Sequence, residues 1–433
     1  MRTYFYSVFH GTRYAAWFLV AIHAFLLLAL VSALYCFGII RYIPLEHNLS
    51  QMDVYWYSQI VRDGYTYSST GMSNAAFFPL FPYLWRATGF GALGIAVFNV
   101  SIFLVAFTLL AQNIRLFPHQ TLLLLSTPVL LFMIVPYTEA LFFLFASLLL
   151  IGLHRRQMLW FILGLLGCGL TRSASTIFTP GLLFMTFLWA AQPGQLWVAI
   201  RWGVTGLLTL LLSLGIVAYI QWYQTGEPWG FVLAQQHWHH VLQWPAYPWR
   251  TASGINMLWL DGAAMWLGLL SIGICCWLFV RLLQRILAQR QLPAVPSIVV
   301  FALGYCVCTF SFILLFQGYS IWNASRYTIA TPFFVVLVWH VSRQPAWSFK
   351  QYAIGTLFTM VFWQMFGIYT DDFDNFNLGE SLWYFGLLTI YIFSYVGWRQ
   401  LPFRREITMI LYVFNLVMQL HLLESFLQSF VVQ

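Results

Sequence analysis

Long apolar runs, each about as long as a membrane-spanning helix, follow one another through almost the whole sequence. A spanning helix needs about 20 mostly apolar residues, and 61% of the 433 residues here are hydrophobic while only 7% are charged. An average soluble domain has about 25% charged residues, so a water-soluble fold is excluded. Disorder is excluded too, because a chain this apolar cannot stay unburied in water. The sequence therefore predicts an all-α polytopic membrane protein.

Thirteen membrane spans are predicted from apolar runs that end at clusters of arginine, proline, glycine or asparagine. The first span follows two arginines but is too long for a signal-peptide core, so we expect it to be retained. Residues 1–433 then form a single integral membrane domain with no separate soluble domain. The approximate spans are 14–39, 91–112, 119–135, 137–153, 157–170, 174–191, 197–222, 253–280, 296–317, 327–342, 350–369, 381–397 and 407–429.

The basic residues indicate which side of the membrane each loop faces. Short cytoplasmic loops are enriched in lysine and arginine. With the N-terminus inside and the C-terminus outside, 14 of the 20 basic residues lie in the cytoplasm, and ten of the twelve acidic residues lie outside. The net charge of +8 thus reflects topology, and no nucleic-acid partner is expected. The six outer basic residues are Arg41, Arg62, Arg86, Arg172, Arg250 and Arg326.

Two outer loops are candidates for function. The first, at about 41–90, contains the segment 52–61, whose apolar side chains share one helical face as in an interfacial helix. Its second apolar segment, 77–85, holds two prolines and is too short to span, so we expect it to lie along the membrane surface. The loop at about 225–250 is rich in tryptophan, histidine and proline, and we interpret it as a substrate loop.

Two outer acids are candidates for chemistry because acidic residues are scarce in this chain. Asp53 begins the predicted interfacial helix. It is either a first-turn acid that favours the helix dipole or a catalytic base that accepts a proton from a substrate hydroxyl. Glu139 lies between two apolar runs, where a carboxylate is costly unless it is paired. It is either a functional or pairing residue or a loop carboxylate in the headgroup layer.

Arg172 and Arg326 each lie at the outer end of an apolar span, where the positive-inside rule does not place them. A guanidinium in that position suits an anion such as a phosphate. The alternative is that both side chains snorkel to lipid headgroups. Snorkelling predicts no particular partner, whereas two outer arginines near outer acids predict a common charged pocket.

No metal or cofactor site is predicted. Residues 237–240 include three histidines, but adjacent histidines in a loop seldom face one ion. The acidic segment 371–374 lacks the glycine and the distal glutamate of a calcium loop. The sequence also contains no glycine-rich phosphate loop and no nucleotide-binding fingerprint.

Short motifs follow one another between about residues 50 and 335, and their order is more specific than any one of them. They are Asp53-Val54-Tyr55-Trp56-Tyr57, Asp63-Gly64-Tyr65, Phe77-Phe78-Pro79-Leu80-Phe81-Pro82, Pro136-Tyr137-Thr138-Glu139, Leu170-Thr171-Arg172-Ser173, Thr225-Gly226-Glu227-Pro228 with Gln235 and Trp238, and Ser325-Arg326-Tyr327. This order resembles the PIG-V-like mannosyltransferases, the family of GPI mannosyltransferase 2 within the GT-C glycosyltransferases. Met52 stands where that family often has tryptophan, and Glu227 where it often has aspartate.

The resemblance implies a GT-C-like bundle that transfers a sugar, with mannose expected from the family. The sugar moves, with inversion, from a polyprenyl-phosphate donor to an acceptor hydroxyl of a glycan, lipid or protein on the outer face. Asp53 is then the base, and Arg172 and Arg326 bind the donor phosphate. No cofactor is needed, and membrane lipids are the other partners. The implied substrate pocket contains Glu139, Tyr137, Trp56, Tyr57, Glu227, Gln235, Trp238 and Tyr327.

A transporter or flippase for a lipid-linked or anionic substrate is the leading alternative function. It would have inverted repeats and charges near the bilayer midplane, whereas the acids here gather at the outer ends of spans. The compact length and the Lys-poor, Gln-rich loops favour a bacterial plasma membrane with an outward-facing active site. The alternative location is the endoplasmic reticulum membrane with a luminal active site.

Overall fold

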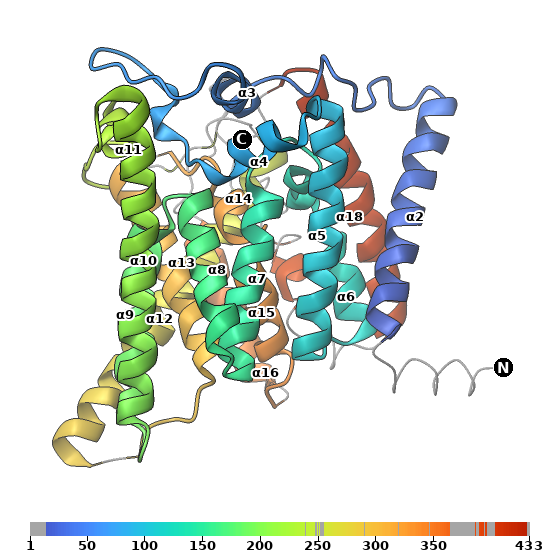
Figure 1. Cartoon of the computed structure of the whole chain (residues 1–433). Helices are drawn as coiled ribbons and strands as arrows, with labels where there is room; N and C mark the ends of the chain where they lie inside the picture. The colour runs from blue at the N-terminus through green and yellow to red at the C-terminus, as the bar shows by residue number, and fades with distance from the viewer. Residues whose placement is uncertain are drawn as a thin grey trace.

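The computed structural model describes residues 14–430 except 239, 247, 248, 250, 252–254, 290, 319, 346, 364–385, 387, 388, 394 and 396–402. Over these residues the chain forms helices and no strand. The longer helices stand side by side as a bundle, and α3 (Asp53–Asp63) and α4 (Leu80–Thr88) lie across one end of it (Figure 1). The predicted all-α class is confirmed.

Within the described residues, six helices are long and apolar enough to cross a membrane. Their outward faces carry large hydrophobic side chains, such as Phe25, Leu208 and Leu287, that are exposed in the protein alone, as expected for surfaces that face lipid tails. The chain is therefore an integral membrane protein. The six helices are α2 (Tyr14–Cys36), α5 (Ala92–Ile114), α10 (Leu196–Thr225), α12 (Ile255–Ala288), α13 (Ser297–Phe316) and α18 (Arg404–Leu427).

Two of the predicted spans, 119–135 and 327–342, are each divided into two helices, so the prediction of a continuous helix is wrong for both. The first is divided into α6 (Pro118–Leu125) and the 3-10 helix η2 (Pro128–Met133). The second is divided into α14 (Ala324–Thr328) and α15 (Pro332–Val341). In each case a proline opens the second piece, because it cannot donate a helical hydrogen bond and disfavours helical backbone at the residue before it.

Three further helices are shorter than the six spans: α7 (Glu139–Arg155), α8 (Met158–Thr171) and α9 (Ala174–Ala190). At 1.5 Å per residue, the 14 residues of α8 extend about 21 Å, less than a hydrocarbon core of about 30 Å. The count of thirteen spans therefore stays a prediction. Of the predicted span 350–369, α16 (Phe349–Trp363) is described, whereas the acidic segment 371–374 and most of 381–397 lie outside the described residues.

The end of the bundle away from α3 collects basic residues that the sequence assigns to one side of the membrane. Arg343 Nη2 donates to the Arg115 carbonyl oxygen at 2.9 Å, and Arg155 Nε donates to Asn113 Oδ1 at 3.1 Å. These contacts join the C-terminal ends of α5, α7 and α15. Arg115, Arg155 and Arg343 thus lie at one end of the bundle, opposite the loop at about 41–90 (Figure 1).

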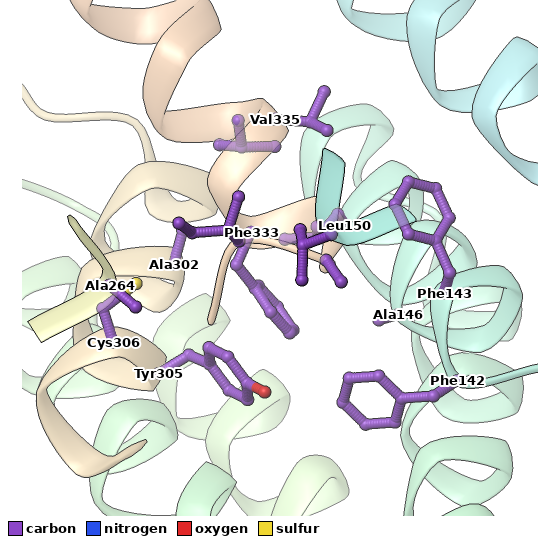
Figure 2. Packing of buried hydrophobic residues seen from close by; sticks show 14 of the residues in the cluster. Phe142, Phe143, Ala146, Leu150, Ala264, Ala302, Tyr305, Cys306, Phe333 and Val335 are labelled. Carbon is purple, nitrogen blue, oxygen red and sulfur yellow. The ribbon is translucent and has the colours of Figure 1, made fainter. Parts of the chain in front are cut away.

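Aromatic rings fill the core between α7, α9, α13 and α15 (Figure 2). The rings of Tyr305 and Phe333 stack at 4.1 Å, and Phe178 packs edge-on against Phe333 at 5.7 Å. Gly181 and Gly304 let α9 and α13 approach closely, since a Cβ at Gly304 would lie 2.7 Å from the Gly181 Cα. Small residues permit such close helix contact in membranes. This packing fixes α7, whose first residue, Glu139, belongs to the charged cluster described below.

The loop at about 41–90 is tied to the bundle by glutamine side chains. Gln221 Nε2 donates to the Ala75 carbonyl oxygen at 2.6 Å, and Gln224 Oε1 accepts from the Tyr65 backbone N–H at 2.7 Å. On the other side, Gln51 Nε2 donates to the Phe426 carbonyl oxygen at 2.7 Å. The loop is thereby held between α10 and α18, which places α3 over the ends of α7 and α14.

Candidate functional site

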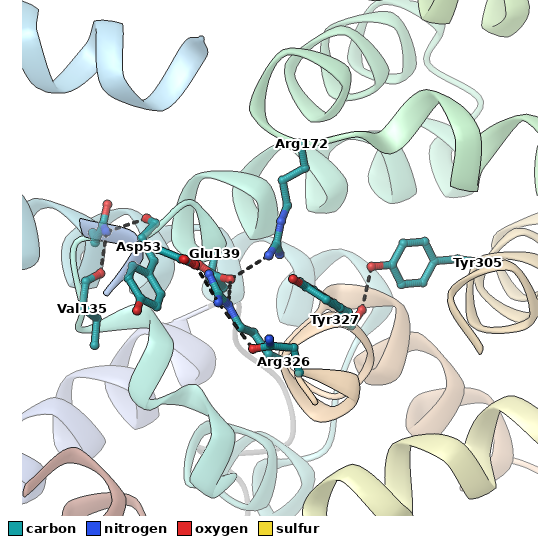
Figure 3. Close-up of polar contacts among 10 residues, drawn as sticks. Asp53, Val135, Glu139, Arg172, Tyr305, Arg326 and Tyr327 are labelled. Carbon is teal, nitrogen blue, oxygen red and sulfur yellow. Dashed lines mark hydrogen bonds and ion pairs between the residues drawn. The ribbon is translucent and has the colours of Figure 1, made fainter. Parts of the chain in front are cut away.

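Glu139 is the centre of a charged cluster at the end of the bundle covered by α3 (Figure 3). It is the first residue of α7, and its side chain is fully buried. Its Oε1 accepts one hydrogen bond from Arg172 Nη2 at 2.9 Å and another from Arg326 Nε. Arg172 directly follows α8, and Arg326 lies in α14. Two guanidiniums and the positive end of the α7 dipole thus stabilise one carboxylate.

Asp53 joins the cluster from the loop at about 41–90. It is the first residue of α3, and its Oδ2 accepts a hydrogen bond from Arg326 Nη1 at 3.0 Å. The side chains of Asp53 and Arg172 are 21% and 17% exposed, whereas those of Glu139 and Arg326 are 0% and 2% exposed. The cluster therefore has a buried half, Glu139 and Arg326, and an accessible half, Asp53 and Arg172. Its two positive and two negative charges balance.

Aromatic rings fix the orientation of both arginines. The Arg326 Cζ lies 4.3 Å from the ring centroid of Tyr137, and the Arg172 Cζ lies 4.8 Å from that of Tyr327. Stacking of this kind is attractive because the ring face is negative. Asn99 Nδ2 holds the segment that carries Tyr137 by donating to the carbonyl oxygens of Val135 and Tyr137, both at 2.9 Å.

Electrostatics keep the donors of the site protonated. Burial works against the charged form of Arg326, but the carboxylates of Glu139 and Asp53 outweigh it and raise the pKa of this guanidinium. Burial raises the pKa of the Tyr57 hydroxyl, and Asp53 and Glu139 add to the rise. Arg326 is therefore a permanent cation and Tyr57 a neutral phenol at any physiological pH.

Met52, the residue before Asp53, has an uncommon backbone conformation, with φ of 54° and ψ of −128°. A positive φ is unfavourable for a residue with a side chain, and such strain is found most often at functional sites. Here the unusual turn lets α3 begin at Asp53, directly beside Arg326. Met52 thus holds a positive φ directly before Asp53 of the cluster.

The predicted substrate loop contributes Trp238 to an aromatic group whose other rings come from the loop at about 41–90. The Trp56 ring lies 5.2 Å from that of Trp238 and 6.3 Å from that of Phe77, and Tyr57 packs edge-on against Phe77 at 4.9 Å. Gln235 Nε2 donates to the Ala76 carbonyl oxygen at 3.5 Å. The structure thus brings together, around Ala76 and Phe77, four of the pocket residues predicted from the sequence: Trp56, Tyr57, Gln235 and Trp238.

Glu227 is not brought to the charged cluster. Its Oε1 accepts a hydrogen bond from the Trp229 backbone N–H at 3.1 Å, so the carboxylate caps a turn of its own loop. Within the part of the chain that is described, no ion pair joins it to Arg172 or Arg326.

Asp261 is a buried acid to which the sequence reading gave no role. It lies in α12 with a fully buried side chain, and it accepts hydrogen bonds from Thr251 and from Ser325, the neighbour of Arg326. The signal that would have found it is its position inside an apolar run, since ionisable residues within spanning helices are functional candidates by default.

No family model matches the chain, and no curated protein or solved structure matches it either. The function has therefore to be inferred from the residues of the site and from the order of the motifs.

Proposed function

We propose that the protein is a polyprenyl-phosphate-sugar-dependent glycosyltransferase of the GT-C type, with mannose as the sugar suggested by the PIG-V-like motifs. One observation carries the proposal: Asp53, Arg172 and Arg326, from three separate segments, meet around Glu139 at one end of an apolar bundle. A GT-C-like arrangement of thirteen spans, with α3 and α4 lying in the membrane interface, belongs to the same proposal.

In the proposed reaction the oxygen of the acceptor hydroxyl attacks the anomeric carbon of the sugar from the side opposite the phosphate. The new carbon–oxygen bond forms as the bond to the phosphate oxygen breaks, which inverts the anomeric centre. Asp53 accepts the proton of the hydroxyl as general base. Arg326 donates to Oδ2 of Asp53. The Asp53 side chain is partly exposed, so a substrate can reach it.

The departing polyprenyl phosphate gains negative charge as the bond breaks, so cations fixed in advance favour the transition state over the ground state. Arg172 is the accessible cation: a guanidinium has five N–H donors, and the hydrogen bond to Glu139 uses one of them. Arg326 supplies charge from the buried side and holds Asp53 in place. Glu139 keeps both guanidiniums oriented while no phosphate is bound.

Substitution of either arginine by lysine is expected to slow transfer, and substitution by alanine to slow it more. Loss of one fixed donor of this kind typically lowers kcat by about 10²- to 10³-fold, and lysine keeps the charge but loses the planar fork. Initial rates of transfer from polyprenyl-phosphate mannose would measure Arg172→Lys, Arg326→Lys and their alanine counterparts. Arg86→Lys, at an exposed position of α4, is the control. Lysine variants as fast as the native protein would remove the phosphate role.

The orientation proposed for the protein is N-terminus inside, C-terminus outside and the charged cluster on the outer face. In a bacterial plasma membrane this face meets the periplasm or the exterior; in the endoplasmic reticulum it meets the lumen. Single cysteines at Ser68 and Gln400, the second outside the described residues, would test it in a variant without the six native cysteines. An impermeant thiol reagent added outside should label Ser68→Cys and not Gln400→Cys. Labelling of Gln400→Cys and not of Ser68→Cys would place the charged cluster on the cytoplasmic face and contradict the proposed orientation.

The rival class, a transporter or flippase, is separated from a transferase by the fate of the sugar–phosphate bond. A transporter would carry the intact donor between leaflets and would place its charges near the midplane. A transferase yields free polyprenyl phosphate and a new glycoside. The gathering of all four charges at one end of the bundle supports the transferase.

A further inference from the structure

A second buried acid lies next to the charged cluster without belonging to it. Asp261 Oδ1 accepts two hydrogen bonds from Ser325, one from its backbone N–H at 2.9 Å and one from its hydroxyl at 2.7 Å. Asp261 Oδ2 accepts a third from the Thr251 hydroxyl at 2.9 Å. A carboxyl group within an apolar bundle is costly unless its oxygens are hydrogen-bonded. The three bonds meet this requirement, and two of them end on the residue before Arg326.

The helix that carries Arg326 is too short to position it alone. Helix α14 has five residues, and a single turn has little stability of its own. Asp261 in α12 holds it on one side of Arg326 through Ser325. On the other side the Tyr305 hydroxyl donates to the Tyr327 carbonyl oxygen at 2.6 Å. The backbone of Arg326 is thus held between α12 and α13.

We propose that Asp261 is a positioning residue for the transfer reaction. By fixing Ser325 it places the Arg326 guanidinium between Glu139 and Asp53, and it thereby orients both the cation for the leaving phosphate and the base. This inference rests on the proposed function. Asp261 touches Ser325 and Thr251 and acts on the reacting groups only through Arg326.

A double-mutant cycle between Asp261 and Arg326 tests the proposal. Displacement of a catalytic group by about 1 Å can lower the rate about 10²-fold, so Asp261→Ala is expected to lower kcat by about 10- to 100-fold. In the Arg326→Ala background the same change should lower kcat by less than about threefold, because the group being positioned is gone. If the fold-losses in kcat of the two single variants multiply in the double variant of an active enzyme, the positioning role is overturned.

Two single-hydroxyl variants provide a matched comparison that does not depend on whether Asp261→Ala folds. Ser325→Ala and Thr251→Val each remove one hydroxyl donor to the same carboxyl group, but only Ser325 adjoins Arg326. One hydrogen bond is worth about 1 kcal/mol, or roughly a fivefold effect. We therefore expect Ser325→Ala to lower kcat several-fold and Thr251→Val to change it less than twofold. Equal effects of the two variants would contradict the proposal. Asp261→Asn, which keeps an oxygen for Ser325, should restore most of the rate lost in Asp261→Ala.

Thermal unfolding in detergent gives a readout that needs no transfer. The midpoint shifts of Asp261→Ala and Arg326→Ala should be non-additive in the double variant if the two residues are coupled. A native protein without transfer activity but with non-additive midpoints would overturn the proposed function and leave the coupling intact. Additive midpoints in an inactive protein would overturn both.

Discussion

The variant Asp53→Asn is expected to transfer sugar at least about a hundredfold more slowly than the native protein, because a positioned base contributes about 10²- to 10⁴-fold. Asparagine has nearly the same shape, and its amide oxygen can still accept the hydrogen bond from Arg326 Nη1. It cannot take the proton of the acceptor hydroxyl. Initial rates at saturating donor would measure the effect, with the yield of detergent-stable protein as a check on folding.

Asp63→Asn is the matched control, because Asp63 is the exposed last residue of the same helix. Its rate should equal that of the native protein. Near-normal turnover in Asp53→Asn would remove Asp53 from the mechanism and shift the search for a base to Glu139.

Glu139→Gln is expected to lower the free energy of unfolding by about 3–5 kcal/mol, the usual effect of removing one partner from a buried ion pair. The substitution leaves Arg172 without its ion-pair partner in the cluster, and it leaves the buried Arg326 with Asp53 alone. Chemical unfolding in mixed micelles, followed by tryptophan fluorescence, would measure the loss.

Glu227→Gln is the control for this stability measurement. Its carboxylate accepts one hydrogen bond within its own loop, so its loss should stay within about 1 kcal/mol. Similar losses in the two variants would show that Glu139 is not the centre of the network.

The sequence predicted the features that follow from local chemistry. Run lengths and the scarcity of charge gave the membrane class, and the predicted interfacial segment 52–61 corresponds to α3, which begins at Asp53. The prediction of one continuous helix at 119–135 and another at 327–342 was wrong. The apolar runs continue across Pro128 and Pro332, but helical hydrogen bonding does not.

The contacts of the site could not be predicted in the same way. Arg326 is 273 positions from Asp53 and 187 from Glu139, and no periodicity encodes a pairing at such distances. The sequence predicted a common charged pocket of arginines and acids, with Glu139 as a functional or pairing residue, but it did not predict which side chains pair. Their sharing of one oxygen of Glu139 and the support of Arg326 by Asp261 both depend on how α7, α12 and α14 pack.

Purified protein in liposomes, incubated with polyprenyl phosphate that carries tritiated mannose and with a lipid and glycan extract as acceptor, gives the most direct test of sugar transfer. The proposed function predicts that the label leaves the donor and appears in a new glycoside, that polyprenyl phosphate is released in equal amount, and that Asp53→Asn slows this conversion at least about a hundredfold. Label that stays on intact donor in the native protein, whether or not the donor changes leaflet, would contradict it.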